Sequence, residues 1–229
     1  MASTMSEPRL LLASQSPRRR ELLALLGLPF EVTVANVAEV PRSGEPPAAL
    51  VTRLSQAKAR AACSERGRRG AACAETIVIT CDTVVALDGA LLGKPRDAAE
   101  ATTMLRRLRG RHHAVYSAVT LLETATGHAL TDVAETRLAM RAYSDAEIAA
   151  YVASGDPLDK AGAYAIQHPG FHPVAEIQGC YANVMGLPLC HLTRCLHAWG
   201  VEPPRDVPVA CQANTGHRCT VHTGILNGQ

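Results

Sequence analysis

The apolar residues of the chain fall into short groups whose spacing alternates between that of buried strands and that of amphipathic helices. The run Arg9–Ala13 predicts a short buried strand, and the leucines after Ser16-Pro17 predict a helix that ends at Gly27. A second helix is expected from about Ala48 to Cys63, because its apolar residues recur every three or four positions. This alternation is typical of mixed α/β proteins.

The middle and the end of the chain continue the pattern. Apolar and β-branched residues over Thr76–Leu87 indicate a buried strand, and Asp88-Gly89 behind them predicts a hairpin turn. Asp97 with Glu100, and Ser144 with Glu147, predict helices that begin with a capping box. Further strands are expected over about 114–122, 129–140 and 174–178, with a loop-rich stretch over 156–173 and a last helix from near 188 to 200.

The length and composition favour one domain followed by a tail. The 229 residues are 47% hydrophobic but only 3% aromatic, so aliphatic side chains must fill the core. The alternating pattern covers residues 9–200 without a repeat, which predicts a single α/β domain there. Residues 201–229 contain several prolines and no periodicity, and we expect them to form a flexible tail.

The charge and the chain's other global features exclude several classes of protein. Lys and Arg (23) nearly balance Asp and Glu (21), so no overall field would attract a nucleic acid or an anionic membrane. No apolar segment approaches the ~20 residues that span a bilayer, and residues 1–8 do not resemble a secretion signal. We therefore expect a soluble cytoplasmic protein, whose eight irregularly spaced cysteines are reduced.

Three arginines crowd the expected start of the first helix, in Ser14-Gln15-Ser16-Pro17-Arg18-Arg19-Arg20. This end of a helix carries the positive pole of the macrodipole, so the arginines cost stability unless an anion offsets them. A phosphate there would meet backbone N–H groups, two serine hydroxyls and guanidinium donors. The segment predicts a phosphate site, and the alternative is that the arginines are only solvated.

Two charged residues stand among apolar neighbours. Asp82 lies inside the predicted strand Thr76–Leu87, where a buried carboxylate needs a cation, a metal or hydrogen-bond donors. It is a candidate metal ligand or a base that activates water, unless it lies on a face that is open to solvent. Lys58 lies on the apolar face of the second helix, where lysines commonly extend their ammonium group into water.

The remaining candidates carry weaker local signals. Lys94 lies between Gly93 and Pro95, a rigid setting for reaching a ligand, although most loop lysines are only solvated. Glu39 has the character of an ordinary loop acid. The segment Asp159–Gln167 combines a charged pair, small residues and an amide that can read a base edge, and the alternative is a structural turn with a surface ion pair.

These segments and one other follow one another in a fixed order: Ser14-Gln15-Ser16-Pro17-Arg18-Arg19, Glu39, Ala57-Lys58-Ala59, Cys81-Asp82-Thr83-Val84-Val85, Gly93-Lys94-Pro95, Asp159-Lys160-Ala161-Gly162-Ala163-Tyr164-Ala165-Ile166-Gln167 and Gly179-Cys180-Tyr181-Ala182-Asn183-Val184-Met185-Gly186-Leu187-Pro188-Leu189. Together they resemble the Maf family of nucleoside triphosphate pyrophosphatases. Several short blocks in the correct order are far more specific than any one of them.

The resemblance implies a fold, an activity and a set of site residues. The fold would be α/β and similar to that of inosine triphosphatase, with a mixed sheet, flanking helices and two lobes around a deep cleft. The activity would be hydrolysis of a nucleoside triphosphate to its monophosphate and pyrophosphate, with Mg²⁺, or Mn²⁺ as the alternative, held by Glu39 and Asp82. The implied catalytic residues are Asp82 as proton acceptor, Glu39, Lys58 and Lys94. The implied substrate-binding residues are Ser14, Arg18, Arg19, Thr83 and Gln167.

The resemblance also bears on the substrate. Asp82-Thr83 and the segment Asp159–Gln167 are similar to the branch that acts on dTTP and UTP, which implies that Arg18, Thr83 and Gln167 set the base preference. The main hypothesis is a house-cleaning enzyme that removes unwanted or modified pyrimidine nucleotides, and the resemblance also favours a homodimer. The alternatives are a noncatalytic nucleotide-binding regulator of cell division and a pyrophosphatase of the 7-methyl-GTP type.

The tail adds one further candidate site. Its Cys211, His217, Cys219 and His222 are residue types that bind zinc. Their spacing matches no common zinc motif, and the sequence shows no second half of a ligand set. The tail lies outside the segments that carry the resemblance.

Overall fold

The protein is described by a computed structural model that covers residues 8–68 and 76–228. Seven strands of this part form one mixed sheet, in the order β2-β1-β3-β5-β6-β7 with β4 paired to β3 outside that path. The strands are β1 (Arg9–Ala13), β2 (Phe30–Thr33), β3 (Thr76–Leu87), β4 (Ala90–Leu92), β5 (His112–Glu123), β6 (Ala129–Met140) and β7 (Val174–Gln178). β1 runs parallel to β2 and β3, and the other pairs are antiparallel.

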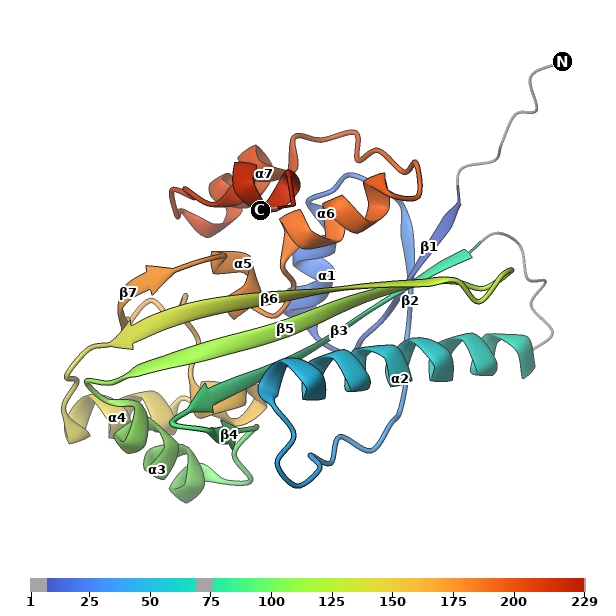
Figure 1. Ribbon diagram of the computed structural model, residues 1–229. Coiled ribbons are helices and arrows are strands. Elements are labelled where there is room, and N and C mark those ends of the chain that lie inside the picture. The colour runs from blue at the N-terminus through green and yellow to red at the C-terminus, as the bar shows by residue number, and fades with distance from the viewer. Residues whose placement is uncertain (1–7, 69–75, 229) are drawn as a thin grey trace, which may run out of the picture.

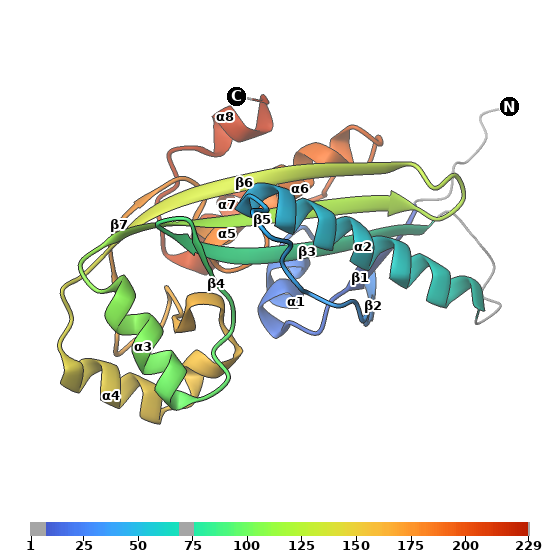
Figure 2. The same cartoon turned by 60° about the horizontal axis from the view of Figure 1, so that its bottom comes forward.

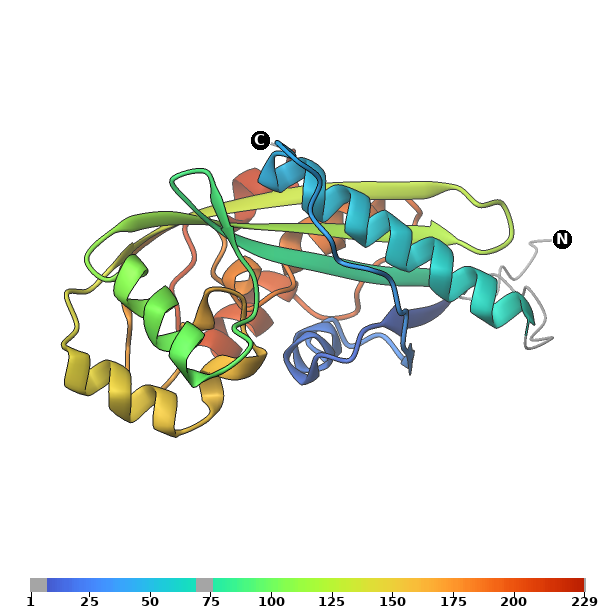
Figure 3. The same cartoon turned by 90° about the horizontal axis from the view of Figure 1, so that it is seen from below.

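Helices cover both faces of the sheet. They are α1 (Pro17–Ala24), α2 (Pro47–Arg68), α3 (Ala98–Leu108), α4 (Asp145–Ala153), α5 (Tyr181–Val184), α6 (Leu189–His197), α7 (Val207–Thr215) and α8 (His222–Leu226), with short 3₁₀ helices η1 (Asp156–Asp159) and η2 (Ala161–Ala163). α2 lies along one face, against β3 and β5, whereas α1, α5 and α6 lie on the opposite face (Figures 1 and 3). The mixed α/β architecture with a central mixed sheet therefore agrees with the sequence prediction.

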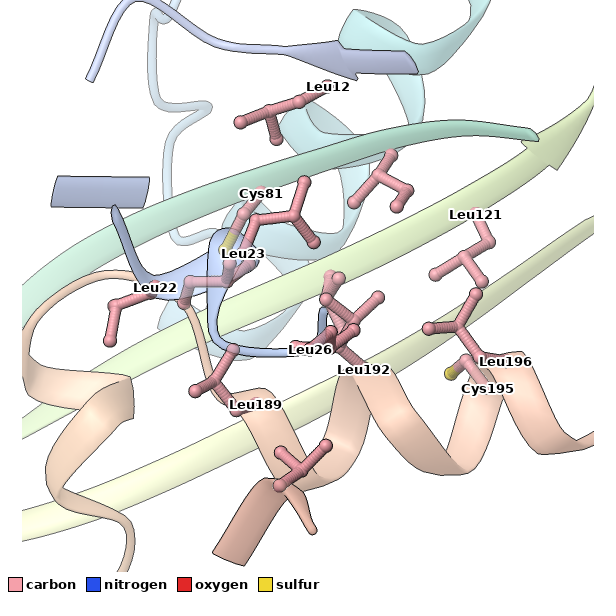
Figure 4. Packing of buried hydrophobic residues seen from close by; sticks show 14 of the residues in the cluster. Leu12, Leu22, Leu23, Leu26, Cys81, Leu121, Leu189, Leu192, Cys195 and Leu196 are labelled. Atoms are coloured by element: carbon pink, nitrogen blue, oxygen red, sulfur yellow. The ribbon is translucent and has the colours of Figure 1, made fainter. Parts of the chain in front are cut away.

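Side chains of the central strands alternate between two cores, because successive residues of a strand point to opposite faces. Leu10 and Leu12 of β1 pack with α1 and α6, whereas Leu11 and Ala13 pack toward α2. Figure 4 shows the first core, in which aliphatic side chains from α1 and α6 meet beneath the sheet. Its labelled leucines are Leu12, Leu22, Leu23, Leu26, Leu121, Leu189, Leu192 and Leu196. Aliphatic residues thus carry this core, as the composition predicts.

A further core lies at one end of the sheet, where α3 and α4 pack side by side (Figure 2). Leu105 and Leu108 of α3 meet Ile148 of α4 and the ring of Tyr143 in this cluster. The Tyr143 hydroxyl donates a hydrogen bond to the Leu105 carbonyl over 2.8 Å, which satisfies the polar atom of a buried ring. This end of the molecule therefore has a core of its own beside the cavity described below.

Several local predictions can be compared directly with the structure. The strands predicted over 76–87, 129–140 and 174–178 have these bounds, and Ser144 with Glu147 forms the expected reciprocal capping box. At α3 the box is only half formed: Asp97 caps the helix, but the Glu100 carboxylate accepts from the Arg96 backbone N–H instead. α2 extends to Arg68, beyond its predicted end, and β2 and α5 were not expected from the sequence. The sequence also predicts a polar connection over residues 64–75, of which 69–75 lie outside the described residues.

The C-terminal segment differs from the flexible tail that the sequence predicts over 201–229. It forms α7 and α8, which lie beside α5 and α6 in Figure 1. Val207 is buried, and Cys211 and Ile225 pack against the core around α6. The few apolar residues of this segment pack on the surface of the preceding domain. Such packing between distant parts of the chain does not produce a periodic pattern in the local sequence. None of the described helices has the length and apolar character needed to cross a membrane.

Candidate active site

A cavity of about 480 Å³ lies where β1 ends beside β3. β1 pairs with β3 only as far as Leu12 opposite Ile79, and β4 begins to pair with the same edge at Val85. Between these pairings no described strand borders this edge of β3. Side chains from both faces of the sheet can therefore reach one cavity, beyond the carboxyl end of a parallel strand, where α/β proteins commonly bind ligands.

Asp82, Lys58 and Glu39 form a cluster on the side of the sheet that faces α2. Asp82 points to this face because strand residues alternate, and α2 presents Lys58 to it. Lys58 Nζ lies 2.5 Å from Oδ1 of Asp82 and 2.6 Å from Oε1 of Glu39. Lys58 and Asp82 are 8% and 6% exposed, whereas the Glu39 side chain is 57% exposed. Two carboxylates thus converge on one ammonium group, one from the interior and one from the cavity mouth.

The two carboxylates have opposite electrostatic settings. Burial raises the pKa of Asp82, and the charges of Lys58 and Arg19 offset this only in part. Burial also opposes ionisation of Glu39, but the hydrogen bond and charge of Lys58, helped by Lys94 and Arg19, more than offset it and lower its pKa. Glu39 is therefore the more acidic partner, and Asp82 is the one whose proton affinity is increased.

On the opposite face of the sheet from the Lys58–Asp82 pair, Arg19 contacts Thr83. Arg19 Nε donates to the carbonyl of Gly186 over 2.8 Å, and its Nη2 donates to Thr83 Oγ1 over 3.1 Å. Thr83 Oγ1 also lies 2.9 Å from Oγ of Ser117. Gly186 has φ of 105°, a conformation that favours glycine, so the turn that presents its carbonyl depends on this residue. The guanidinium of Arg19 is consequently held in a defined position at the cavity.

The start of α1 supplies the hydroxyl groups and the second arginine. Ser16 Oγ caps the helix by accepting from the Arg19 backbone N–H over 3.4 Å, and Ser14 Oγ accepts from the Ser16 N–H over 3.2 Å. Both hydroxyls keep their own proton to donate to an anion. Arg18 Nη1 lies 3.1 Å from Oδ2 of Asp159, and Asp159 also pairs with Lys160. An anion entering the cavity would therefore compete with Asp159 for Arg18.

The comparison with known proteins decides the family. The Maf-like protein family matches residues 9–199. This chain belongs to the Maf family. A dTTP/UTP pyrophosphatase of Anaeromyxobacter dehalogenans is 46% identical over 203 residues, which are 88% of this chain and 99% of that protein. A dTTP/UTP pyrophosphatase of Myxococcus xanthus is 48% identical over 195 residues, which are 85% of this chain and 94% of that protein.

A solved structure is also similar. It is a nucleoside-triphosphatase, named dITP/XTP pyrophosphatase, from Mycobacterium abscessus, with a TM-score of 0.40 and 17% sequence identity. The match covers 83% of this chain and 98% of that chain. The expected two lobes around a deep cleft stay a prediction for this Maf protein.

The structure brings the predicted site residues of this Maf protein together, although they come from six separate segments. Those that line the cavity are Ser14, Arg18, Arg19, Glu39, Lys58, Thr83, Lys94 and Gln167. Asp82 is the exception: it does not line the cavity, but its carboxylate contacts Lys58, which does. Lys94 and Gln167 are exposed at the cavity, on the loop after β4 and on the loop after η2.

Two lining features were not singled out as site residues from the sequence. The carbonyl of Gly186 positions Arg19, and Asn36 lines the cavity from the segment after β2. Gly186 lies within the segment 179–189, which carries the family resemblance, so its position in that segment could have indicated a role at the site. Asn36 lies in Ala35-Asn36-Val37, where nothing in the local sequence indicates a site.

The carboxylate pair fits a divalent cation of the magnesium type. Mg²⁺ is commonly held by one or two carboxylates and takes its remaining ligands from water and substrate phosphates. Glu39 and Asp82 already converge on one positive charge, the Lys58 ammonium. Among residues 8–68 and 76–228, no three His, Cys, Asp or Glu side chains group as a metal site. A cation that needs only two protein carboxylates is therefore the kind that this site could hold.

Proposed function

We propose that this chain hydrolyses dTTP and UTP to the monophosphate and pyrophosphate. The observation that carries the proposal is the convergence of Arg18, Arg19, Lys58 and Lys94 on one cavity with the carboxylates Glu39 and Asp82 beside them. A triphosphate carries several negative charges, and four cations fit it better than a neutral ligand. The curated relatives named dTTP/UTP pyrophosphatase support the pyrimidine assignment.

The chemistry follows from the charges. A water oxygen would form a bond to the α phosphorus, and the bond from that phosphorus to the bridging oxygen would break, which releases pyrophosphate. Asp82 would accept the proton of the water, a role that its raised pKa suits. Lys58 and Lys94 would stabilise the charge that develops on the leaving pyrophosphate. When bound by Glu39 and Asp82, Mg²⁺ would further neutralise the phosphates and favour ionisation of water.

The remaining residues would position the nucleotide. Ser14, Ser16 and Arg18 at the start of α1 would receive phosphate oxygens, which would displace Asp159 from Arg18. Thr83 and Gln167 would select the base, because an amide can both donate to and accept from the edge of a uracil. We further propose that residues 9–200 are the catalytic domain and that the cavity is the cleft that the family resemblance implies.

One experiment tests the proposal. Pyrophosphate release is measured over a panel of nucleoside triphosphates, with and without Mg²⁺. We expect turnover of dTTP and UTP that depends on the metal and exceeds turnover of purine nucleotides. Tight binding of dTTP without release of pyrophosphate would instead indicate a nucleotide-binding regulator. Preference for 7-methyl-GTP would assign the chain to the other substrate class.

A further inference from the structure

The segment after the family match folds onto the body of the protein at a defined place. Its two helices, α7 and α8, cover α5 and α6 (Figure 1). The ring of His217 stacks on Tyr181 at a centroid distance of 4.9 Å, and Arg194 of α6 donates to the Ile225 carbonyl over 3.0 Å. The segment and the body therefore share a real contact surface, between residues within and beyond the range 9–199 that the family covers.

A small cavity at this contact is lined by four cysteines. Cys180 and Cys190 come from the body, at the start of α5 and of α6, and Cys211 and Cys219 come from the C-terminal segment. Its volume is about 10 Å³, room for about one water-sized sphere. The imidazoles of His217 and His222 also line it. Two cysteines of the body thus line the same small cavity as two cysteines of the C-terminal segment.

The four cysteines lie at a largely buried contact: Cys180 and Cys190 are buried, and Cys211 and Cys219 are partly buried. Burial raises the pKa of the Cys180, Cys190 and Cys211 thiols, so thiolates form here only when a cation takes the place of the protons. Gln212 accepts from the Cys219 backbone N–H over 2.9 Å, which holds the loop between α7 and α8 next to the cavity.

The C-terminal segment also needs a source of stability beyond its apolar contacts. α7 and α8 have nine and five residues. Of the hydrophobic residues that the structure describes in these two helices, only Val207 is buried. A short segment with so little buried apolar surface does not easily offset the entropy lost on ordering it. Small structural units usually solve this problem with disulfides or a structural metal. Cys180, Cys190, Cys211 and Cys219 form no disulfide among the described residues, and thiolates of cysteine are the ligands of many structural zinc sites.

We propose that Cys180, Cys190, Cys211 and Cys219 bind one Zn²⁺ ion, which fastens the C-terminal segment to the body. Binding replaces four S–H bonds with four zinc–sulfur bonds and releases four protons to solvent, which leaves a centre of net charge −2. The described side chains are not yet gathered around one point as a bound ion requires. The cysteine side chains would therefore rotate toward the cavity centre on binding, with the imidazoles at its border.

The first test is metal analysis of the full-length protein, purified under reducing conditions without added metal. We expect close to one zinc per chain in the wild type and in Cys63→Ser, which removes a thiol on α2 away from the cavity. Cys211→Ser and Cys219→Ser should each lose most of the zinc. Equal zinc content in all four proteins would place the metal elsewhere, for example at the carboxylates of the active site, and would overturn the proposal.

A second test needs no variant. After zinc is removed by a chelator, Co²⁺ is added in the presence of excess Mg²⁺, which competes for carboxylate sites. Four thiolates should produce the intense sulfur-to-cobalt charge-transfer absorption of a tetrahedral site, and Zn²⁺ should abolish it and raise the melting temperature. Absence of this absorption in the folded wild-type protein would overturn the proposal. So would a disulfide between any two of the four cysteines, detected by mass spectrometry of the protein as purified.

Discussion

The ammonium nitrogen of Lys58 lies 2.5 Å from Oδ1 of Asp82, and both residues are more than nine-tenths buried. A buried ion pair is sensitive to the loss of either partner, because the remaining charge is then desolvated without compensation, at a cost of about 3 to 5 kcal/mol. The same pair lies at the centre of the proposed chemistry. Substitutions here therefore require separate measurements of stability and of catalysis.

Asp82→Asn should nearly abolish turnover while the protein stays folded. The amide keeps the shape of the side chain but cannot accept the proton of the attacking water, so kcat should fall about 100-fold or more. Lys58 retains Glu39 as a partner. Pyrophosphate release from dTTP measures the rate, and dTTP binding by calorimetry shows that the cavity is intact. Turnover within a few fold of wild type would remove Asp82 from the mechanism.

The acidic limb of the pH–rate profile should reflect Asp82. Burial raises the pKa of Asp82 above its usual value of 3.8, and the base is active only when ionised. The logarithm of kcat/KM should thus fall as the pH decreases through a value above that of an ordinary aspartate. Glu39, whose pKa is lowered, should remain ionised over this range. A rate that is constant down to the pKa of an ordinary aspartate would contradict this assignment.

Lys58 and Lys94 should differ in their effect on stability but not on the direction of the rate change. Lys58→Met leaves Asp82 buried without its cation, so both kcat and the free energy of unfolding should fall. Lys94→Ala removes an exposed charge, so kcat should fall with little change in stability. The control is Arg20→Ala, an exposed arginine of α1 outside the cavity lining, which should change neither. If Lys94→Ala has wild-type kinetics with dTTP, that lysine is only solvated.

Gln167→Ala should narrow the preference for pyrimidines. Loss of the amide leaves the uracil edge without its hydrogen-bond partner. An unpaired polar group in a site can change the ratio of kcat/KM between two substrates by orders of magnitude, whereas one methyl group changes it by only about 10- to 200-fold. We expect the wild type to accept dTTP, UTP and 5-substituted uracil nucleotides, and the variant to lose more activity on these than on ATP. Competition between UTP and ATP measures the ratio of kcat/KM directly. Equal wild-type rates on ATP and UTP would contradict the assignment.

His113 should make the folded state sensitive to acid. Burial, with a smaller contribution from His112, lowers the pKa of His113 from 6.5 to about 4. Between these values the unfolded chain binds a proton that the folded protein excludes, so the stabilisation present above pH ~6.5 is lost as the pH falls toward ~4, by an amount of the order of 3 kcal/mol. Urea unfolding across this range should show a flatter pH dependence for His113→Gln than for the wild type. The exposed His172, replaced by Asn, serves as the control and should leave the slope unchanged.

His113 also connects the interior to the cavity. Its Nε2 lies 2.7 Å from the Tyr164 hydroxyl, and Tyr164 lines the cavity. The contact between His113 and Tyr164 was not predicted from the sequence, because 51 positions separate the two residues. Local patterns indicate that a residue is buried, but the partner of a buried polar group depends on which elements pack together.

The sequence by itself determined most of the local helices and strands, and it contains the residue blocks that resemble the Maf family. The bounds of β3 and β6, the cap at Ser16 and the capping box at Ser144 follow from neighbouring residues, since alternation and capping act within a few positions. Asp82 and Lys58 could each be suspected because a charge within an apolar pattern requires an explanation.

Only the tertiary structure decided how these residues meet. The pairing of Asp82 with Lys58 depends on which face of β3 receives α2, and the shared cavity depends on β1 ending before β4 begins to pair with β3. The same applies to the C-terminal segment, where Cys211 and Cys219 meet Cys180 and Cys190 only after α7 and α8 dock on the body. Such contacts join residues far apart in the chain, and their geometry is set by the packing of whole helices and strands rather than by any spacing that the sequence displays.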